Sequence, residues 1–367
     1  MPAPALITRY EDDMALLPGA WHRLGALVGA FALLAYPFVV DGQWLTNGNL
    51  VLVTVVGALG MMLLMGLSGQ LSLGHAAFLA IGAYTTAILA ERTGMPFWLS
   101  MPIAGLSAAA VAIAIGPVAL RLRGMHLALV TLGLLFVVSH TLHAAHAYTH
   151  GSLGMEVTPH GWFPSDGNNR HAAFSESSEW LGLEFTLERK LFLVFLPVTL
   201  LAALGAANLQ RSNTGRAMMA ERDREVAATV LGVHPGKARV MALGLSSFLA
   251  GVSGSMFAVQ QQRIAIEPTF DLTVSVAYLA MVVLGGMGSV FGAIWGAVLF
   301  VALAPLATDL FEALAPVAPM FAGLGAPQQA TLLACLLAGA FLLFEPLGLV
   351  GLWLRAKRYL LAWPFRY

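Results

Sequence analysis

Long apolar blocks alternate with short polar segments along most of the chain. Residues 48–66, 98–120, 125–146 and 328–344 each approach or exceed the roughly 20 residues that cross about 30 Å of hydrocarbon as a helix. Lipid offers no partner for backbone N–H and C=O groups, so such blocks must be helical. The alternating strands of a transmembrane barrel are not apparent in the pattern. We therefore predict an all-α, polytopic membrane helix bundle.

The same pattern predicts about ten transmembrane helices. Glycine and polar residues interrupt the third, eighth and ninth of them, so any of these three could be broken or re-entrant. The composition agrees with a membrane protein, because 58% of the residues are hydrophobic and only 10% are charged, whereas soluble domains average about 25% charged residues. The predicted ranges are 24–40, 48–66, 70–90, 98–120, 125–146, 191–208, 240–262, 273–287, 290–305 and 328–349.

Basic residues predict the orientation of this bundle, because cytoplasmic loops are enriched in lysine and arginine. With the N-terminus inside, 14 of the 19 basic residues fall in cytoplasmic segments. Both termini are thus expected in the cytoplasm, with the bundle in a bacterial inner membrane. Residues 1–23 are expected to form a retained tail, 24–354 one membrane domain and 355–367 a basic tail. The five outer basic residues are Arg92, Arg170, Arg189, Lys190 and Arg263.

Two loops are long enough to carry function: residues 147–190 outside and 209–239 inside. In the inner loop, Ser212, Asn213 and Thr214 are suited to begin a short helix, which Gly232 and Pro235 would end. Charges cluster in its middle, whereas Met219, Val226 and Val230 recur near whole turns. This pattern predicts an amphipathic helix that docks into a groove on a partner protein; a helix on the membrane surface or a solvated loop is the alternative.

Gly236 and Lys237 resemble the end of a phosphate-binding loop. Ala238 follows in place of Ser or Thr, however, and Leu231 stands where the first glycine would be. Any ATP chemistry must then come from a partner. We expect no catalytic residue, metal or cofactor in this chain, and the single cysteine, Cys335, lies in an apolar run and predicts neither a disulfide nor a reactive thiol.

The end of the inner loop resembles a known motif. Glu225-Val-Ala227-Ala228, followed by Gly232, is similar to the Glu-Ala-Ala…Gly coupling loop of ABC importer permeases. The resemblance implies that the loop inserts into a cleft of an ATPase subunit and transmits its closure to the membrane helices. The candidate coupling residues are Arg216, Glu221, Glu225, Ala227, Ala228 and Gly232.

Glycine-rich segments carry a more specific resemblance. Residues 66–84, GLSGQLSLGHAAFLAIGAY, resemble the signature of branched-chain amino acid (Liv-type) ABC permeases. Residues 282–296 resemble the later Leu-Gly-Gly-x-Gly-Ser…Gly motif of that family, and 344–351 its C-terminal motif, although Glu345 stands where the family has arginine. The matching positions in the first signature are Gly69, Gln70, Ser72, Gly74, His75, Phe78, Gly82 and Tyr84.

Polar groups in these segments are costly in hydrocarbon, so Gln70 and His75 should face a cavity or hydrogen-bond a neighbouring helix. The glycines permit either an unwound helix that exposes backbone to substrate or close helix packing. Gly285, Gly286 and Gly288 are typical of a tight helix–turn–helix or a re-entrant tip. The candidate pathway or gate residues are Gln70, Ser72, His75, Tyr84, Gly285, Gly286 and Gly288.

The resemblance implies an importer of Leu, Ile or Val that works by alternating access. Its implied partners are two ATPase subunits, a second related permease and a periplasmic substrate-binding protein. Permeases for urea or amides on nearly the same scaffold are the alternative within the class. An ion-coupled secondary transporter is a second alternative, although the predicted spans hold almost no carboxylates. The zero net charge argues against a nucleic-acid partner.

Histidines gather at the outer end of the fifth predicted helix. Three of the four fall within about 60° on one helix face, an arrangement that could bind Zn²⁺ or Cu²⁺, as in a membrane enzyme. Polar lining or contact with water is the competing interpretation, which we favour. His150 also replaces the first glycine of the family's outer Thr-Gly-Gly segment, the surface that faces the binding protein. The cluster is His140, His143, His146 and His150.

Overall fold

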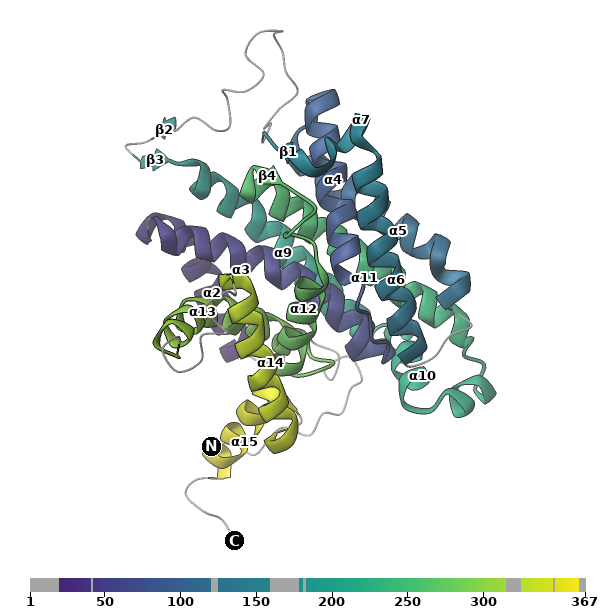
Figure 1. Ribbon diagram of the computed structural model, residues 1–367. Helices are drawn as coiled ribbons and strands as arrows, with labels where there is room; N and C mark the ends of the chain where they lie inside the picture. Colours follow the sequence, from purple (N-terminus) through teal and green to yellow (C-terminus); the bar gives the residue numbers. More distant parts are fainter. Residues whose placement is uncertain are drawn as a thin grey trace.

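Residues 20–40, 42–119, 125–158, 178–180, 183–314, 325–345 and 347–362 are described by the computed structural model. They are largely helical (Figure 1), and each of the ten predicted ranges overlaps a helix, so the all-α class is confirmed. The first five are α2 (Ala20–Val39), α3 (Gln43–Met61) continued by the π-helix η1 (Met62–Leu67), α4 (His75–Thr93), α5 (Phe97–Ala119) and α6 (Met125–Ala144). The last five are α9 (Leu187–Arg211), α11 (Pro235–Gln261), α12 (Leu272–Gly285), α13 (Val290–Leu314) and α14 (Ala326–Phe344).

Short elements connect these helices. Two-residue strands β1 (Met155–Glu156) and β4 (Arg263–Ile264) pair antiparallel, as do β2 (Ser178–Trp180) and β3 (Leu183–Phe185). The sequence pattern did not predict these strands. The remaining elements are α7 (His146–Thr149), the 3₁₀ turn η2 (Gly151–Leu153), α10 (Asn213–Val230) and α15 (Gly348–Ala362).

Helix α11 lies at the centre of the bundle and packs on α3, α4 and α5. A second group, α12, α13 and α14, joins this core through contacts of α13 with α3 and of α12 with α4. Glycines make the close packing possible: a Cβ on Gly251 would lie 2.6 Å from the carbonyl oxygen of Ala104 on α5. Helix α6, by contrast, exposes Leu129, Phe136 and Val137 on its outward face, as expected for a lipid-facing helix.

In the described part of the chain, six helices are long and apolar enough to cross a membrane: those containing Gln43–Leu67, Phe97–Gly116, His126–Ala144, Leu187–Arg211, Pro235–Gln261 and Val290–Ala313. Three apolar helices are shorter, and α12, with 14 residues, reaches only about 21 Å at 1.5 Å per residue. Helix α4 is absent from both sets because it carries more polar residues. Helix α4 can carry these polar residues because most of its length is buried against protein rather than lipid.

Several predicted boundaries were wrong; the ninth helix, for example, was predicted to end at residue 305 but ends at Leu314. The third helix begins at His75 instead of residue 70, because residues 69–74 are irregular. The last predicted helix, 328–349, ends at Phe344, and α15 begins after a break at Gly348, whose φ is 63°. The predicted basic tail, 355–367, thus starts inside α15. Most of the predicted N-terminal tail lies outside the described residues.

Loop contacts sort to opposite ends of the bundle (Figure 1). At one end, Arg92 donates to the carbonyl oxygen of Ala147 at 2.8 Å, and β1 pairs with β4. At the other end lie α10 and α15, where Gln210 donates to the carbonyl oxygen of Gly288 at 2.7 Å. This segregation agrees with the predicted alternation of inner and outer loops.

Candidate functional site

The first glycine-rich signature contains a break between two helices. The π-helix η1 ends at Leu67, and Gly69 has a φ of 67°, which glycine adopts without strain. The N–H of Gln70 then bonds to the carbonyl oxygen of Leu64 at 3.1 Å, six residues back. Unwinding, one of the two predicted roles for these glycines, therefore occurs at Gly69.

Gln70 and Ser72 are buried within this break. Gln70 Nε2 donates to Ser68 Oγ at 2.5 Å, whereas its Oε1 has no hydrogen-bond partner among the described residues. Ser72 Oγ accepts from the N–H of Gly74 at 3.3 Å, and Thr131 Oγ1 on α6 accepts from the N–H of Leu73 at 3.0 Å. Side-chain oxygens thus satisfy backbone groups that the break leaves without helical partners.

His75 forms the first turn of α4 and is bonded to α3. Its Nε2 lies 3.1 Å from the carbonyl oxygen of Gly57, and its ring centroid is 5.1 Å from that of Tyr278 on α12. Only 1% of His75 is exposed. Of the two predicted roles, this geometry is that of interhelical hydrogen bonding. Tyr84, also predicted for the pathway, is likewise buried in the core.

The second glycine-rich segment is a tight turn between α12 and α13, as predicted. Gly286 and Gly288 have φ values of 122° and 82°. Gly285 packs so closely on α13 that a Cβ there would collide with the backbone of Gly292. A Cβ on Gly66 would lie 2.5 Å from the backbone nitrogen of Gly288. The structure therefore brings the two predicted glycine segments into direct contact.

Helix α10 forms the inner loop and begins and ends where the sequence predicted. Ser212 Oγ accepts from the N–H of Gly215 at 3.1 Å, Gly232 follows the last turn with a φ of 87°, and Pro235 opens α11. Arg224 interrupts the helix with non-helical backbone angles. Predicted Arg216 lies exposed on the first segment and donates to the carbonyl oxygen of Arg211.

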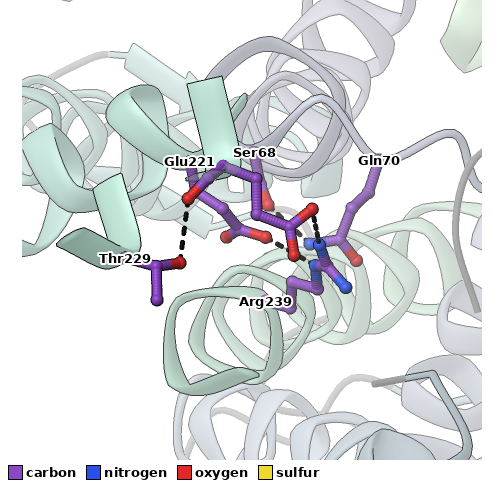
Figure 2. Close-up of polar contacts among 6 residues, drawn as sticks. Ser68, Gln70, Glu221, Thr229 and Arg239 are labelled. Atoms are coloured by element: carbon purple, nitrogen blue, oxygen red, sulfur yellow. Dashed lines mark hydrogen bonds and ion pairs between the residues drawn. The ribbon is translucent and has the colours of Figure 1, made fainter. Parts of the chain in front are cut away.

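A buried ion-pair network anchors α10 to α11 (Figure 2). Arg239 Nε lies 2.5 Å from Glu221 Oε1, and its Nη2 lies 3.2 Å from Glu225 Oε2. The side chains of Glu221 and Arg239 are 4% and 12% exposed. Two of the predicted coupling residues are thus held by one arginine at the base of α11. Ala228 is buried beside them.

The far end of α10 is apolar and points away from the bundle. Val226, Val230 and Leu231 are 81%, 83% and 83% exposed, and predicted Ala227 is exposed between them. The helix is therefore amphipathic in an unusual sense, because polar Glu221 and Glu225 face the protein while valines face outward. We call Val226, Ala227, Val230 and Leu231 the α10 tip.

Sequence reasoning missed three residues that connect these parts: Gln210, Arg222 and Arg239. Gln210 and Arg222 reach backbone carbonyl oxygens, at Gly288 and Gly66. Because every residue carries a backbone carbonyl oxygen, the sequence does not indicate which of them a side chain will bind. For Arg239 the charges of α10 gave no signal, because its three arginines balance its three acidic residues.

The histidine cluster does not assemble a metal site in the described residues. Helix α6 ends at Ala144, so the helix face that His143, His146 and His150 were predicted to share is interrupted. His150 Nε2 lies 3.3 Å from Glu91 Oε1, and both side chains are nearly half exposed.

A separate apolar cavity of about 680 Å³ lies between α5, α9 and α11. None of the predicted pathway residues lines it.

Apolar spanning helices, a broken helix against a glycine turn and a projecting inner helix together define a polytopic membrane transport protein. The family described as "Branched-chain amino acid transport system / permease component" matches residues 45–344. The chain is 36% identical over 284 residues to the "High-affinity branched-chain amino acid transport system permease protein LivM" of Escherichia coli, covering 76% of this chain and 67% of that protein. The Salmonella typhimurium protein of the same description is 34% identical over the same shares. No solved structure matches.

The chain therefore belongs to the family of permease components of branched-chain amino acid transport systems. This confirms the resemblance that the glycine-rich signatures predicted. It also makes the chain a multi-pass membrane transport subunit of an ABC complex, rather than an enzyme.

Proposed function

We propose that this chain carries leucine, isoleucine or valine across a bacterial inner membrane, driven by two partner ATPase subunits. A second related permease completes the membrane pathway, and a periplasmic binding protein delivers the substrate. Family membership and the names of the relatives support the substrate class. Both termini lie in the cytoplasm in this proposal, as the distribution of basic residues indicates.

The observation that carries the ATP-driven part is the α10 tip. An exposed apolar surface at the end of a water-facing helix favours a protein partner. The base of α10 is fixed by buried Glu221 and Arg239, whereas its tip has no such anchor. A partner that moves the tip would transfer that motion to α11, the central helix of the bundle.

Such motion would serve alternating access. The membrane helices would switch between two arrangements as the ATPases close and open. Gln70 and Ser72 of the broken helix and the turn at Gly285, Gly286 and Gly288 lie where α10 meets the bundle, and we propose that they contribute to its inner gate. His75 and Tyr84, which are buried between helices, would support the pathway rather than touch substrate.

The test is uptake into proteoliposomes that contain the complete complex with ATP inside. Labelled leucine should accumulate only with ATP and with the binding protein present, and excess unlabelled urea should not compete. Competition by urea would instead support the alternative substrate class. Leucine uptake driven by an ion gradient without ATP would contradict the proposal.

Val230→Asp should separate docking from folding in the same system. Val230 is 83% exposed, so a charge there leaves the folded protein intact but opposes an apolar contact with an ATPase. We expect loss of ATPase co-purification and of uptake, with unchanged thermal stability. Leu153→Asp is the matched control for ATPase co-purification, since Leu153 is 79% exposed at the opposite end of the bundle, away from the ATPases. Normal ATPase binding by Val230→Asp would exclude the α10 tip as the docking surface.

A further inference from the structure

We infer that Arg222 is the positioning residue that ties α10 to both the broken helix and the glycine turn. The inference deepens the proposed function and rests on it. No predicted site included Arg222, which lies between the two coupling residues that Arg239 binds.

The contact of Arg222 with the broken helix has a clear cause. In a continuous helix, the carbonyl oxygen of Gly66 would accept from the N–H of Gln70, four residues on. In the break, that N–H bonds to Leu64 instead. Arg222 Nη1 donates to the carbonyl oxygen of Gly66, so the guanidinium takes the place of the missing backbone donor. A cation at the C-terminal end of a helix is also favoured by the helix dipole.

The arginine fits this position because Gly69 lacks a side chain. A Cβ on Gly69 would lie 2.6 Å from Arg222 Cγ, so any other residue there would displace the arginine. Asp223 Oδ1 accepts from Arg222 Nε at 2.9 Å and holds the guanidinium in orientation. The side chain of Arg222 is 36% exposed, so it lies partly between the segments that it joins.

Arg222 also lies close to the glycine turn between α12 and α13. Arg222 Nη1 lies 3.6 Å from the position of a Cβ on Gly288. Gln210, in the last turn of α9, donates to the carbonyl oxygen of Gly288 at 2.7 Å. The segment that contains the end of α9 and the first half of α10 thus holds the broken helix through Arg222 and the turn through Gln210.

The arrangement assigns Arg222 a role in transmission. Movement of α10 by an ATPase would pull directly on Gly66 and on the neighbouring turn, the two places where the helices are interrupted. Removal of the guanidinium would leave the α10 tip able to dock, because Val226 and Val230 are unchanged. Docking and ATP hydrolysis would then continue without the corresponding movement of the gate.

The experiment measures leucine uptake and ATP hydrolysis together, in the reconstituted full complex, for Arg222→Ala and Arg222→Lys. For Arg222→Ala we expect normal ATPase co-purification, retained ATP hydrolysis and at least a tenfold lower ratio of leucine transported to ATP hydrolysed. Arg222→Lys, which can still donate to Gly66, should recover part of that ratio. A merely structural role would lower assembly and hydrolysis in parallel with uptake.

Arg224→Ala is the control, because Arg224 is exposed on the same helix and should keep the normal ratio. If Arg222→Ala does not accumulate as folded complex, Arg222→Met provides the same measurement with an unbranched side chain that fills space but cannot donate to Gly66. A normal ratio in a folded Arg222→Ala or Arg222→Met complex would overturn the inference. Absence of ATP-driven uptake by the wild-type complex would instead contradict the proposed function itself.

Discussion

At the scale of single residues, several polar side chains inside this protein donate to backbone carbonyl oxygens of other helices. Asn49 donates to Glu188 at 3.0 Å, Thr199 to Leu52 at 3.2 Å and Ser253 to Val53 at 2.8 Å. The cost of polar groups in hydrocarbon predicted that Gln70 and His75 would need partners. It could not predict which partners, because every residue offers the same backbone oxygen.

The Glu221–Arg239 pair leads to a prediction about stability. Arg239→Met would leave Glu221 buried without its cation, and breaking such a pair costs about 3–5 kcal/mol. Adding Glu221→Gln should recover much of the loss, since the buried charge is then gone. Unfolding in mixed micelles would measure both. Lys237→Met, an equivalent change at an exposed position on the same helix, should change stability by less than about 0.5 kcal/mol. Equal losses of stability in Arg239→Met and in the double variant Arg239→Met/Glu221→Gln would show that the buried charge of Glu221 does not cause the loss.

At the scale of elements, hydrophobic blocks predicted where helices lie because lipid imposes one requirement on every spanning segment. The break at Gly69 was harder to locate. Leu71 and Leu73 continue the apolar pattern through it, so the third helix was predicted to start too early. The turn after the short helix α12 was easier to predict, because closely spaced glycines indicate a tight turn. Gly286 and Gly288 do adopt the positive φ values that such a turn requires.

Helix packing at α4 and α11 supplies a second stability prediction. A Cβ on Gly254 would collide with the backbone carbonyl of Leu79, which cannot rotate away. Gly254→Ala should therefore lower stability by about 1–3 kcal/mol, the usual cost of overpacking. Gly205→Ala on α9 has nothing within 4 Å of its new methyl group and should be neutral. The comparison can be made by thermal unfolding in detergent. Equal effects at the two positions would argue against close packing of α4 on α11.

At the scale of the whole molecule, the structure separates two sets of loops but does not itself say which faces the cytoplasm. The orientation comes from the distribution of basic residues alone. The sequence could also not predict that β1 pairs with β4, because two-residue strands carry no pattern of their own. Their pairing depends on segments more than 100 residues apart that meet only when the bundle is assembled.

Cysteine labelling can determine the orientation directly. Cys335 is the only native cysteine, so Cys335→Ala provides a background without thiols. Leu153→Cys should react with a membrane-impermeant maleimide added to spheroplasts, whereas Lys237→Cys should react only after the membrane is opened. Both positions are exposed, so burial does not confuse the result. The reverse pattern would place both termini outside.

The polar character of α4 has a consequence for how the chain is made. Its buried Thr86 donates to Ser255 of α11 at 2.6 Å, and α11, the main partner of α4, begins only at Pro235. More than 140 residues must therefore be synthesised before α4 acquires the surroundings that suit it. We expect the insertion machinery or a membrane chaperone to hold α4 during that interval. Variants that weaken the α4–α11 contact would then be removed by membrane proteases before they ever meet a substrate.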